Sequence, residues 1–418
     1  MPPVYDSYRD QLFLSSYQLI DLYHLVDSKM KRLILLRLAV LVLTMAPLPV
    51  FSGSFMDGFI DPEDGMLDLS HYLAEKKGFL PIPIIITEPA VGLGAGVALV
   101  FLHDPLSGRV PDGETFEPQS VDERGKMIPP SISALFGAYT ENDTWLAGGA
   151  HMGIWKNDNV RYTGAVFTGS INMRFYREAQ GTEVSANANI EPNVLLQELM
   201  FRINGSNFFA GVNYLYVDTS VEIGLTAIDP GFTLETGSRD AAVGLMLDYD
   251  SRDSIFTPGK GLKASITASL YREDVGGETN YDRYEAKALY FTSLTDVFPL
   301  GLRADFQTID GERAEIPFYA YPFINLRGIP MMRYQGDSTA VGEVELGWKL
   351  TPRWTIIGFG GAGRAVDIGS SDSSTTVYTR GAGVRYFIAR RFGAHIGFDV
   401  AKGPEDTAFY LQFGHAWN

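Results

Sequence analysis

The chain has 418 residues, with 44 glycines, 26 phenylalanines, 21 tyrosines, no cysteine and a formal net charge of −16. The acidic balance argues against a nucleic-acid partner, because phosphate binding needs clustered lysine and arginine. Without cysteine there is no disulfide framework and no cysteine-ligated metal site. Many glycines and aromatics with a near-neutral mean hydropathy are typical of a large β protein with many turns, and not of a helical membrane protein.

An apolar block near the amino terminus predicts export. Residues 30–54 read MKRLILLRLAVLVLTMAPLPVFSGS, with a positive start, an apolar stretch at 38–50 and small residues at 52–54. This is the order of a secretory signal peptide, and the stretch is short for a membrane helix, although an uncleaved anchor is the alternative. Because a signal peptide lies at the terminus, we interpret residues 1–29 as an upstream extension and Met30 as the start.

Residues 55–79 predict a short periplasmic segment that contains an amphipathic helix. GMLDLSHYLAEKKG, at 65–78, carries apolar residues at near-helical spacing. Asp68 or Ser70 could cap the start of this helix, and Gly78 could end it.

From residue 80 to residue 418 the sequence alternates with a period of two, as strands do. In TAVGEVELGWKL, at 339–350, Val344, Leu346 and Trp348 share one face, and Glu343 and Glu345 share the other. Such segments recur over a length too great for an ordinary sandwich domain. One charged face and one aliphatic face suit a wet lumen and a lipid exterior, so we predict an all-β fold: a transmembrane antiparallel β-barrel of about 16 strands.

Motifs for catalysis or cofactors are weak. Gly358, Gly360 and Gly363 have the spacing of a dinucleotide-binding loop, but the residues that follow cannot form the required helix. These glycines are better explained by another segment that packs closely against a strand. His395 and Asp399 share a strand face, which would suit either the base and orienter of a hydrolase or two lumen-facing polar residues. We expect no catalysis, no cofactor and no bound metal.

A charged turn lies in DYDSRDSIFTPGKG, at residues 248–261. It joins the end of one predicted strand to the start of the next, and a well-built hairpin would explain it by itself. Its distinctive residues are Asp250, Arg252, Asp253, Pro258 and Gly261.

Together with three other segments, this hairpin resembles the bacterial surface-antigen barrels of the BamA and TamA superfamily. The hairpin is similar to the D-x-R-D…P-x-x-G motif of that family, and NLRGIP, at 325–330, resembles its V-R-G-F loop motif. GFLPIPIIITEPAVGLGAGVAL, at 78–99, looks like the barrel entry of members that lack large periplasmic repeats. AFYLQFGHAWN, at 408–418, resembles the closing-strand signal through Phe409, Leu411, Phe413 and Trp417.

The resemblance implies a sixteen-stranded outer-membrane barrel in which the long connection over residues 311–336 folds back into the lumen. There the arginine of the loop motif pairs with acidic residues on the wall. In this sequence the arginine is Arg327, followed by Gly328, and Glu345 is the expected first partner with Glu343 as the second. Family members usually add an aspartate on the next strand, but Gly361 stands at that position.

The resemblance also implies a role in outer-membrane biogenesis, by insertion or export of polypeptide or by lipid handling at the barrel seam, without covalent catalysis. The expected partners are outer-membrane lipids, unfolded client polypeptides and accessory lipoproteins. Residues 55–77 are too few for one periplasmic POTRA domain, which puts delivery of clients by such repeats in doubt. The alternatives are a passive channel of the same fold and an outer-membrane hydrolase.

Overall fold

A computed structural model describes residues 59–70, 78–103, 128, 130–179, 182–224, 233–254, 257–367, 374–390 and 393–417. The chain divides into two units, Met1–Leu67 and Asp68–Asn418. The predicted extension and signal peptide lie outside the described residues, as do residues 71–77 of the predicted helix. Leu67 forms an antiparallel bridge with Ile60, whereas Ser70 is helical and its N–H donates to Asp68 Oδ1 at 2.6 Å. No helix within the described residues is long and apolar enough to cross a membrane.

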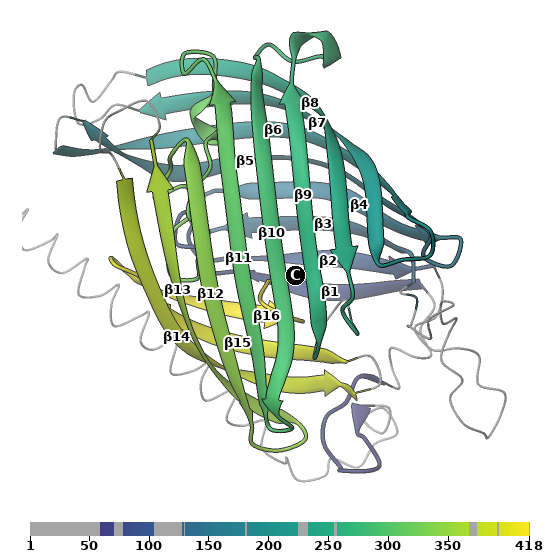
Figure 1. Ribbon diagram of the computed structural model, residues 1–418. Coiled ribbons are helices and arrows are strands. Elements are labelled where there is room, and N and C mark those ends of the chain that lie inside the picture. Colours follow the sequence, from purple (N-terminus) through teal and green to yellow (C-terminus); the bar gives the residue numbers. More distant parts are fainter. Residues whose placement is uncertain are drawn as a thin grey trace, which may run out of the picture. The chain divides into compact units, whose positions relative to one another are not determined.

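The second unit is a sheet of 16 strands, in agreement with the predicted all-β barrel (Figure 1). The strands are β1 (Gly78–Ile86), β2 (Gly94–Leu102), β3 (Ile132–Thr140), β4 (Trp145–Trp155), β5 (Val160–Ala179), β6 (Thr182–Arg202), β7 (Phe208–Gly224), β8 (Thr233–Asp250), β9 (Gly261–Tyr271), β10 (Tyr281–Thr295), β11 (Phe298–Gly311), β12 (Ser338–Lys349), β13 (Trp354–Val366), β14 (Ser374–Ala389), β15 (Ala394–Lys402) and β16 (Thr407–Phe413). Two short 3-10 helices, η2 (Glu273–Val275) and η3 (Phe318–Ala320), lie in the connections.

Every strand pairs antiparallel with the next one along the chain. Connections that follow odd-numbered strands therefore lie at one end of the barrel, which we call end A. Connections that follow even-numbered strands lie at the opposite end, end B, where β1 also begins and β16 also finishes. The longest described connection, residues 312–337 between β11 and β12, starts at end A, and we call it the lumen loop.

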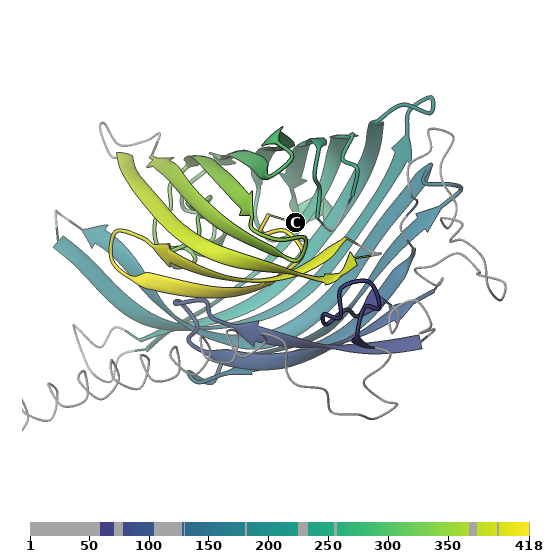
Figure 2. The same ribbon diagram turned by 90° about the horizontal axis from the view of Figure 1, so that it is seen from below.

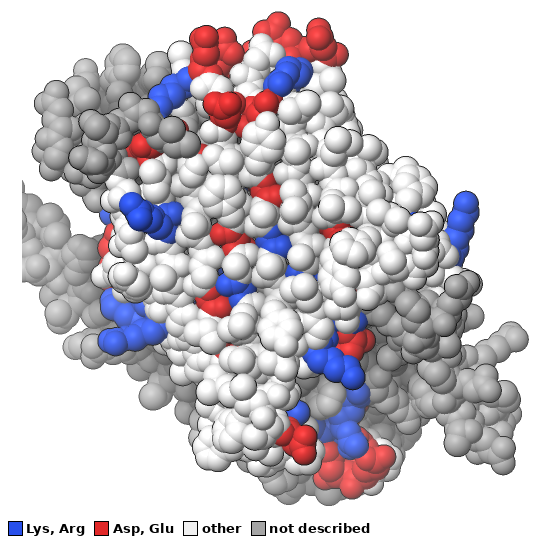
Figure 3. Space-filling view, viewed as in Figure 1, with Lys and Arg blue, Asp and Glu red and all other residues white. Residues whose placement is uncertain are grey.

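The two faces of the sheet differ in polarity, as the alternation predicts. On β12 the side chains of Val344 and Leu346 are exposed on the outside, whereas Glu343 and Glu345 are buried on the inside. Exposed aromatic side chains recur near end B, as in the interfacial belts of membrane barrels: Trp155, Phe201, Phe208, Phe298, Trp348 and Phe413. Large areas of the outer surface in Figure 3 are uncharged, and acidic residues gather at its two ends.

The first and last strands lie side by side, and the barrel is nearly closed (Figures 1 and 2). Among the described residues, however, no backbone ladder joins β1 to β16. Pro81 and Pro83 are alternate residues of β1 and lack the N–H that a ladder requires. Proline is tolerated in a sheet where its nitrogen faces the open edge, which explains both its place in the edge strand and the incomplete closure.

Candidate functional site: an arginine cage in the lumen

The lumen loop lies inside the barrel, although connecting segments usually run over a protein surface. It carries a series of buried apolar side chains, namely Ile316, Ala320, Ile324, Leu326, Ile329 and Met332. Ile324, Leu326 and Ile329 pack against Val341 of β12 and neighbouring strands. Burial of these apolar groups is the force that draws the loop inward, since each is worth roughly 1.5–3 kcal/mol on full burial.

Arg327, near the tip of this loop, is enclosed by three carboxylates. Its Nε donates to Glu343 Oε1 at 2.8 Å, and its Nη1 donates to Asp399 Oδ2 at 2.8 Å. Glu345 Oε2 also lies 2.8 Å from Nη1, as an ion pair without hydrogen-bond geometry. The guanidinium carbon lies 3.5 Å from the centre of the Phe359 ring, which adds a cation–π contact. We call these five residues the arginine cage.

The cage is secluded from water, and its charges are strongly coupled. Arg327 is 7% exposed. Burial alone would lower the pKa of Arg327, but the attraction of Glu345, Glu343 and Asp399 raises it above its ordinary value. Arg327 therefore stays charged, and it offsets the carboxylates that surround it.

Two further arginines extend the network to the neighbouring strands. Arg385 of β14 donates from Nη2 to Asp399 Oδ2 at 3.0 Å and to Gln412 Oε1 of β16 at 2.9 Å. Arg303 of β11 pairs with Asp305 and lies 3.5 Å from Glu343 Oε2. The network therefore ties the loop to strands on both sides of it.

Two glycines make room for the loop. Gly328 has a φ of +92°, and a Cβ there would lie 2.9 Å from Gly403 N. Its own N–H donates to Tyr410 Oη at 2.8 Å. A Cβ at Gly363 would lie 2.3 Å from Ile324 of the loop, so for this glycine the predicted close packing of another segment is confirmed. A Cβ at Gly358 would have no atom of another segment within 4 Å, so close packing does not explain this glycine.

Gly361 occupies the position where the barrels that this sequence resembles usually have an aspartate, and the structure shows why a larger residue does not fit here. It lies opposite Glu343 in the ladder, and a Cβ there would be 2.7 Å from Leu326 Cδ2. The third carboxylate of the cage comes instead from Asp399 on β15. The sequence placed Asp399 on an inward face, but it offered no reason to join it to Arg327, because 72 residues separate the two.

The predicted closing-strand signal divides between two environments. Phe409, Leu411 and Phe413 belong to β16, and Leu411 and Phe413 are exposed on the outside. Strand β16 ends at Phe413, and Gly414, with a φ of +81°, redirects the chain. Trp417 is consequently buried and faces the lumen.

Trp417 also contacts the arginine cage, through Glu343. Its indole N–H donates to Glu343 Oε2 at 2.7 Å, and its ring packs against Leu289 and Phe291 of β10. A Cβ at Gly301 would lie 2.8 Å from that ring. Trp417 therefore differs from Leu411 and Phe413, because its strand ends four residues earlier.

The charged hairpin forms its own cluster at end B. Asp250 is buried and accepts from Arg252 Nε at 3.0 Å and from Arg161 Nη1 at 3.2 Å. Asp253 Oδ1 accepts from the backbone N–H of Gly259 at 2.9 Å. Gly261 has a φ of +110°, and Pro258 is buried. These contacts stabilise the turn between β8 and β9.

His395 and Asp399 do not form a base and its orienter. Asp399 is bound to Arg327 and Arg385, whereas the His395 ring stacks on Phe387 at 4.3 Å between ring centres. No hydrogen bond joins the two residues in the described part of the chain. This arrangement removes the geometric basis for a hydrolase centred on His395.

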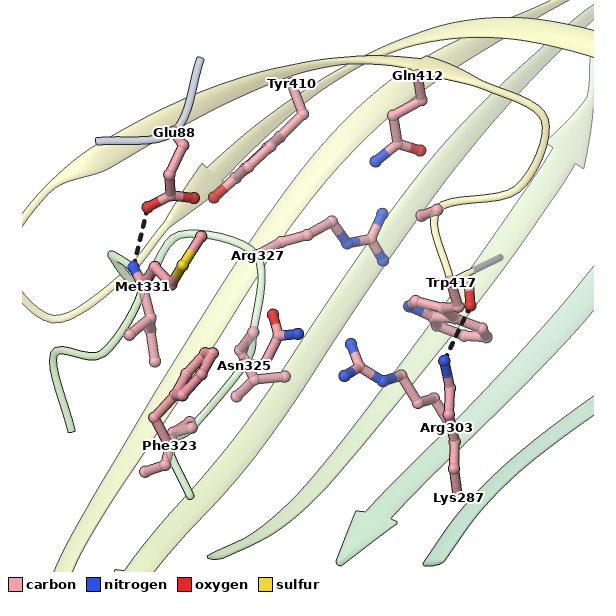
Figure 4. Close-up of a pocket in the computed structure, with 14 residues that line it drawn as sticks. Glu88, Lys287, Arg303, Phe323, Asn325, Arg327, Met331, Tyr410, Gln412 and Trp417 are labelled. Carbon is pink, nitrogen blue, oxygen red and sulfur yellow. Dashed lines mark hydrogen bonds between the residues drawn. The ribbon is translucent and has the colours of Figure 1, made fainter. Parts of the chain in front are cut away.

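A cavity of about 350 Å³ lies between the lumen loop and the wall (Figure 4). Glu88 and Tyr410 lie towards one end of it, and Lys287 and Trp417 towards the other. Lys287 Nζ donates to the backbone oxygen of Trp417 at 3.2 Å. Arg303, Arg327 and Gln412 also line the cavity, and they belong to the network around the arginine cage.

The sixteen antiparallel strands, the inward loop and the buried arginine agree with the barrel that the resemblance to the BamA and TamA superfamily implies. Within it, residues 154–324 match the family model described as the Omp85 superfamily domain. No curated protein matches the chain.

Solved structures of the same fold have little sequence in common with this chain. BamA from Haemophilus ducreyi, in a crystal structure lacking POTRA domains 1–3, has a TM-score of 0.50 and 12% identity over 87% of this chain and 81% of that one. CdiB from Escherichia coli has a TM-score of 0.51 and 11% identity over 79% and 61%. CdiB from Acinetobacter baumannii has a TM-score of 0.50 and 10% identity over 80% and 59%. At these identities the likeness concerns the fold alone.

Proposed function

We propose that this barrel acts in outer-membrane biogenesis, by handling polypeptide or lipid at the seam between β1 and β16, without covalent chemistry. Export through the signal peptide at residues 30–54, unfolded client chains and accessory lipoproteins are parts of this proposal. The observation that carries it is the seam: two neighbouring strand edges without a backbone ladder between them in the described residues. An open edge offers unpaired backbone groups to an extended chain.

Contacts of the lumen loop hold the two sides of the seam together. On the β1 side, Glu88 Oε1 accepts from the backbone N–H of Met331 at 2.9 Å. On the β16 side, Tyr410 accepts from Gly328, and Glu405 accepts from Arg333 Nε at 2.9 Å. A few hydrogen bonds of this kind, each worth about 0.5–1.5 kcal/mol net, separate far more easily than a full ladder. They support a seam that opens and closes.

The filled lumen argues against a passive channel. Met332 of the loop is buried against Met173, Ala188, Ile190 and Val221, on the long strands β5, β6 and β7. Ala90, in the turn between β1 and β2, packs against the same cluster. A water-filled path through the barrel would require this apolar cluster and the arginine cage to separate together.

Deletion of the gene tests the proposal at the level of the cell. Protein and lipid composition of the outer membrane is measured in the deleted strain and after complementation. We expect altered amounts of particular outer-membrane proteins or lipids, restored by the parent gene. Unchanged composition would contradict a role in biogenesis.

Disulfides introduced near the seam test whether the protein acts by opening there. The chain has no native cysteine, so an introduced pair has no other cysteine of the chain to react with. Glu88→Cys with Met331→Cys joins the loop to the β1 side and so closes the seam. Arg333→Cys with Glu405→Cys joins the loop to the turn between β15 and β16, leaves the β1 side free and serves as the matched control. We expect only the first pair to abolish complementation when oxidised, with recovery on reduction. Equal activity of both oxidised pairs would exclude seam opening.

A further inference from the structure

A second polar cluster lies on the outside of the barrel, separate from the arginine cage in the lumen. Ser133 Oγ lies 2.8 Å from His103 Nε2 and 2.8 Å from His151 Nδ1. These residues come from the end of β2, from β3 and from β4. Ser133 faces His151 in the ladder, and the N–H of His103 donates to Ser131 O at 3.1 Å, which extends the pairing of β2 with β3 by one residue.

The alternation of the strands places this cluster on the outer face. Ser133 shares its face of β3 with Leu135, which is 58% exposed, and His151 shares its face of β4 with Trp155, which is 44% exposed. Trp155 belongs to the aromatic residues near end B. Such residues mark the level of the lipid headgroups, so the cluster lies at the boundary between headgroups and acyl chains.

Two glycines shape the surroundings of the cluster. A Cβ at Gly153 would lie 2.5 Å from the Trp155 ring, and a Cβ at Gly164 would lie 2.4 Å from Tyr162 Oη. Because both positions are glycine, the two aromatic side chains fold back over the sheet and stack, with ring centres 5.7 Å apart. The ring centre of Trp155 lies 6.4 Å and that of Tyr162 lies 6.0 Å from the ring centre of His151. The two aromatic rings therefore flank the cluster on one side.

The chemistry of the cluster suits binding better than catalysis. Ser133 has one hydroxyl proton, so it donates to one imidazole and accepts an N–H from the other. A serine beside a histidine is also the arrangement of a nucleophile and its base. However, within the described residues no carboxylate hydrogen-bonds to either imidazole. The backbone N–H groups of β3 and β4 belong to ladders on both sides, which leaves no pair of them to stabilise an oxyanion.

We propose that His103, Ser133 and His151 bind the phosphate headgroup of a glycerophospholipid in the leaflet at end B. The imidazole that accepts the Ser133 proton carries its N–H on the other ring nitrogen, and this N–H donates to a phosphate oxygen. The second imidazole donates in the same way when it is protonated, and Ser133 holds the two rings in place. Trp155 and Tyr162 cover the glycerol region, and the acyl chains lie along the exposed apolar side chains further from end B, such as Leu135. This site is separate from the seam, and its test is independent of the biogenesis role.

Binding of lipids to the purified full chain in detergent micelles tests the site. Native mass spectrometry compares phosphatidylglycerol with diacylglycerol of the same acyl chains, which lacks the phosphate, and with inorganic phosphate. We expect the parent to retain phosphatidylglycerol at least fivefold better than diacylglycerol. Ser133→Ala and the double variant His103→Gln with His151→Gln should lose most of this preference.

The matched control is Thr168→Ala, which removes another exposed hydroxyl whose partner is Asn193. It should retain the preference of the parent, and heat-modifiable migration on gels should show that every variant is folded. The proposal is overturned if the parent has no preference for the phospholipid, if both cluster variants keep it, or if inorganic phosphate binds equally well. Release of lysophospholipid by the parent, abolished by Ser133→Ala, would replace a binding site with a hydrolytic one.

Discussion

Arg327 Nη1 and Asp399 Oδ2 lie 2.8 Å apart, although the residues are 72 positions apart in the chain and belong to a loop and to β15. Together with Glu343 and Glu345 of β12, this contact fixes the tip of the lumen loop against two separate parts of the wall. The loop is therefore held by charge as well as by its apolar side chains. Loss of the arginine leaves buried carboxylates without their main counter-charge.

Arg327→Ala should strongly destabilise the barrel. Removal of one partner from a buried ion-pair network typically costs about 3–5 kcal/mol, because the remaining charges stay buried without compensation. Heat-modifiable migration on gels should show unfolding at lower temperature than for the parent. Glu345→Ala should resemble it with a smaller effect, since Glu343 and Asp399 still face the arginine.

Arg327→Lys is the matched control for charge. Lysine keeps the positive charge but lacks the planar fork that reaches two carboxylates at once, so stability should fall between those of the parent and of Arg327→Ala. If Arg327→Ala and Glu345→Ala both unfold at the temperature of the parent, the cage does not hold the loop.

Gly361→Asp, which introduces the residue usual at this position in the BamA and TamA superfamily, should destabilise this protein. A Cβ at position 361 would lie 2.7 Å from Leu326 Cδ2, and a fourth carboxylate would enter the cage without a new cation. Adding Leu326→Ala should relieve the collision and recover part of the loss. A double-mutant cycle of unfolding temperatures measures the coupling, and purely additive effects would show that the two residues do not compete for space.

Trp417 should matter through its ring and, separately, through its indole N–H. Trp417→Phe keeps much of the packing on Leu289 and Phe291 but removes the hydrogen bond to Glu343, at a cost of about 1.5–3 kcal/mol for a charged acceptor. Trp417→Ala also opens a cavity and should cost about 3–5 kcal/mol. Unfolding temperatures rank the variants. Equal loss in both would mean that the hydrogen bond, and not the packing, sets the effect.

The contact of the loop with Glu405, in the turn between β15 and β16, should weaken in acid. Burial alone would raise the pKa of Glu405, but hydrogen bonds from Arg333 and Tyr334 hold it below the ordinary 4.5. A lowered pKa means that this contribution is complete above about pH 4.5 and is lost as the pH falls through the folded value. The effect should be modest, because the carboxylate is partly exposed.

Hydrogen exchange of the backbone around Arg333 measures this contact. After correction for intrinsic rates, protection in the parent should fall as the pH is lowered from above 4.5 through the folded pKa of Glu405. In Glu405→Gln it should be low throughout. Identical pH profiles for the two proteins would show that another group controls the acid response.

The period-two alternation of residues such as Val344 and Glu345 was enough to predict the sheet, its two faces and the approximate number of strands. Those properties depend on local geometry, because each residue of a strand faces the side opposite to its neighbours. The pairing of the arginine with its two glutamates was also predicted, but only through the resemblance of a short motif to a known family. The same alternation does not predict that β16 ends at Phe413, four residues before Trp417.

Tertiary structure alone decided the completion of the cage. Asp399 reaches Arg327 because β12, β13, β14 and β15 curve around the loop, and no local pattern encodes that curvature. Gly361 accommodates Leu326 because the loop approaches β13 more closely than a side chain would permit. The sequence by itself determined which residues face the lumen. Their partners there depend on distances across the barrel, which are set only when all the strands have assembled.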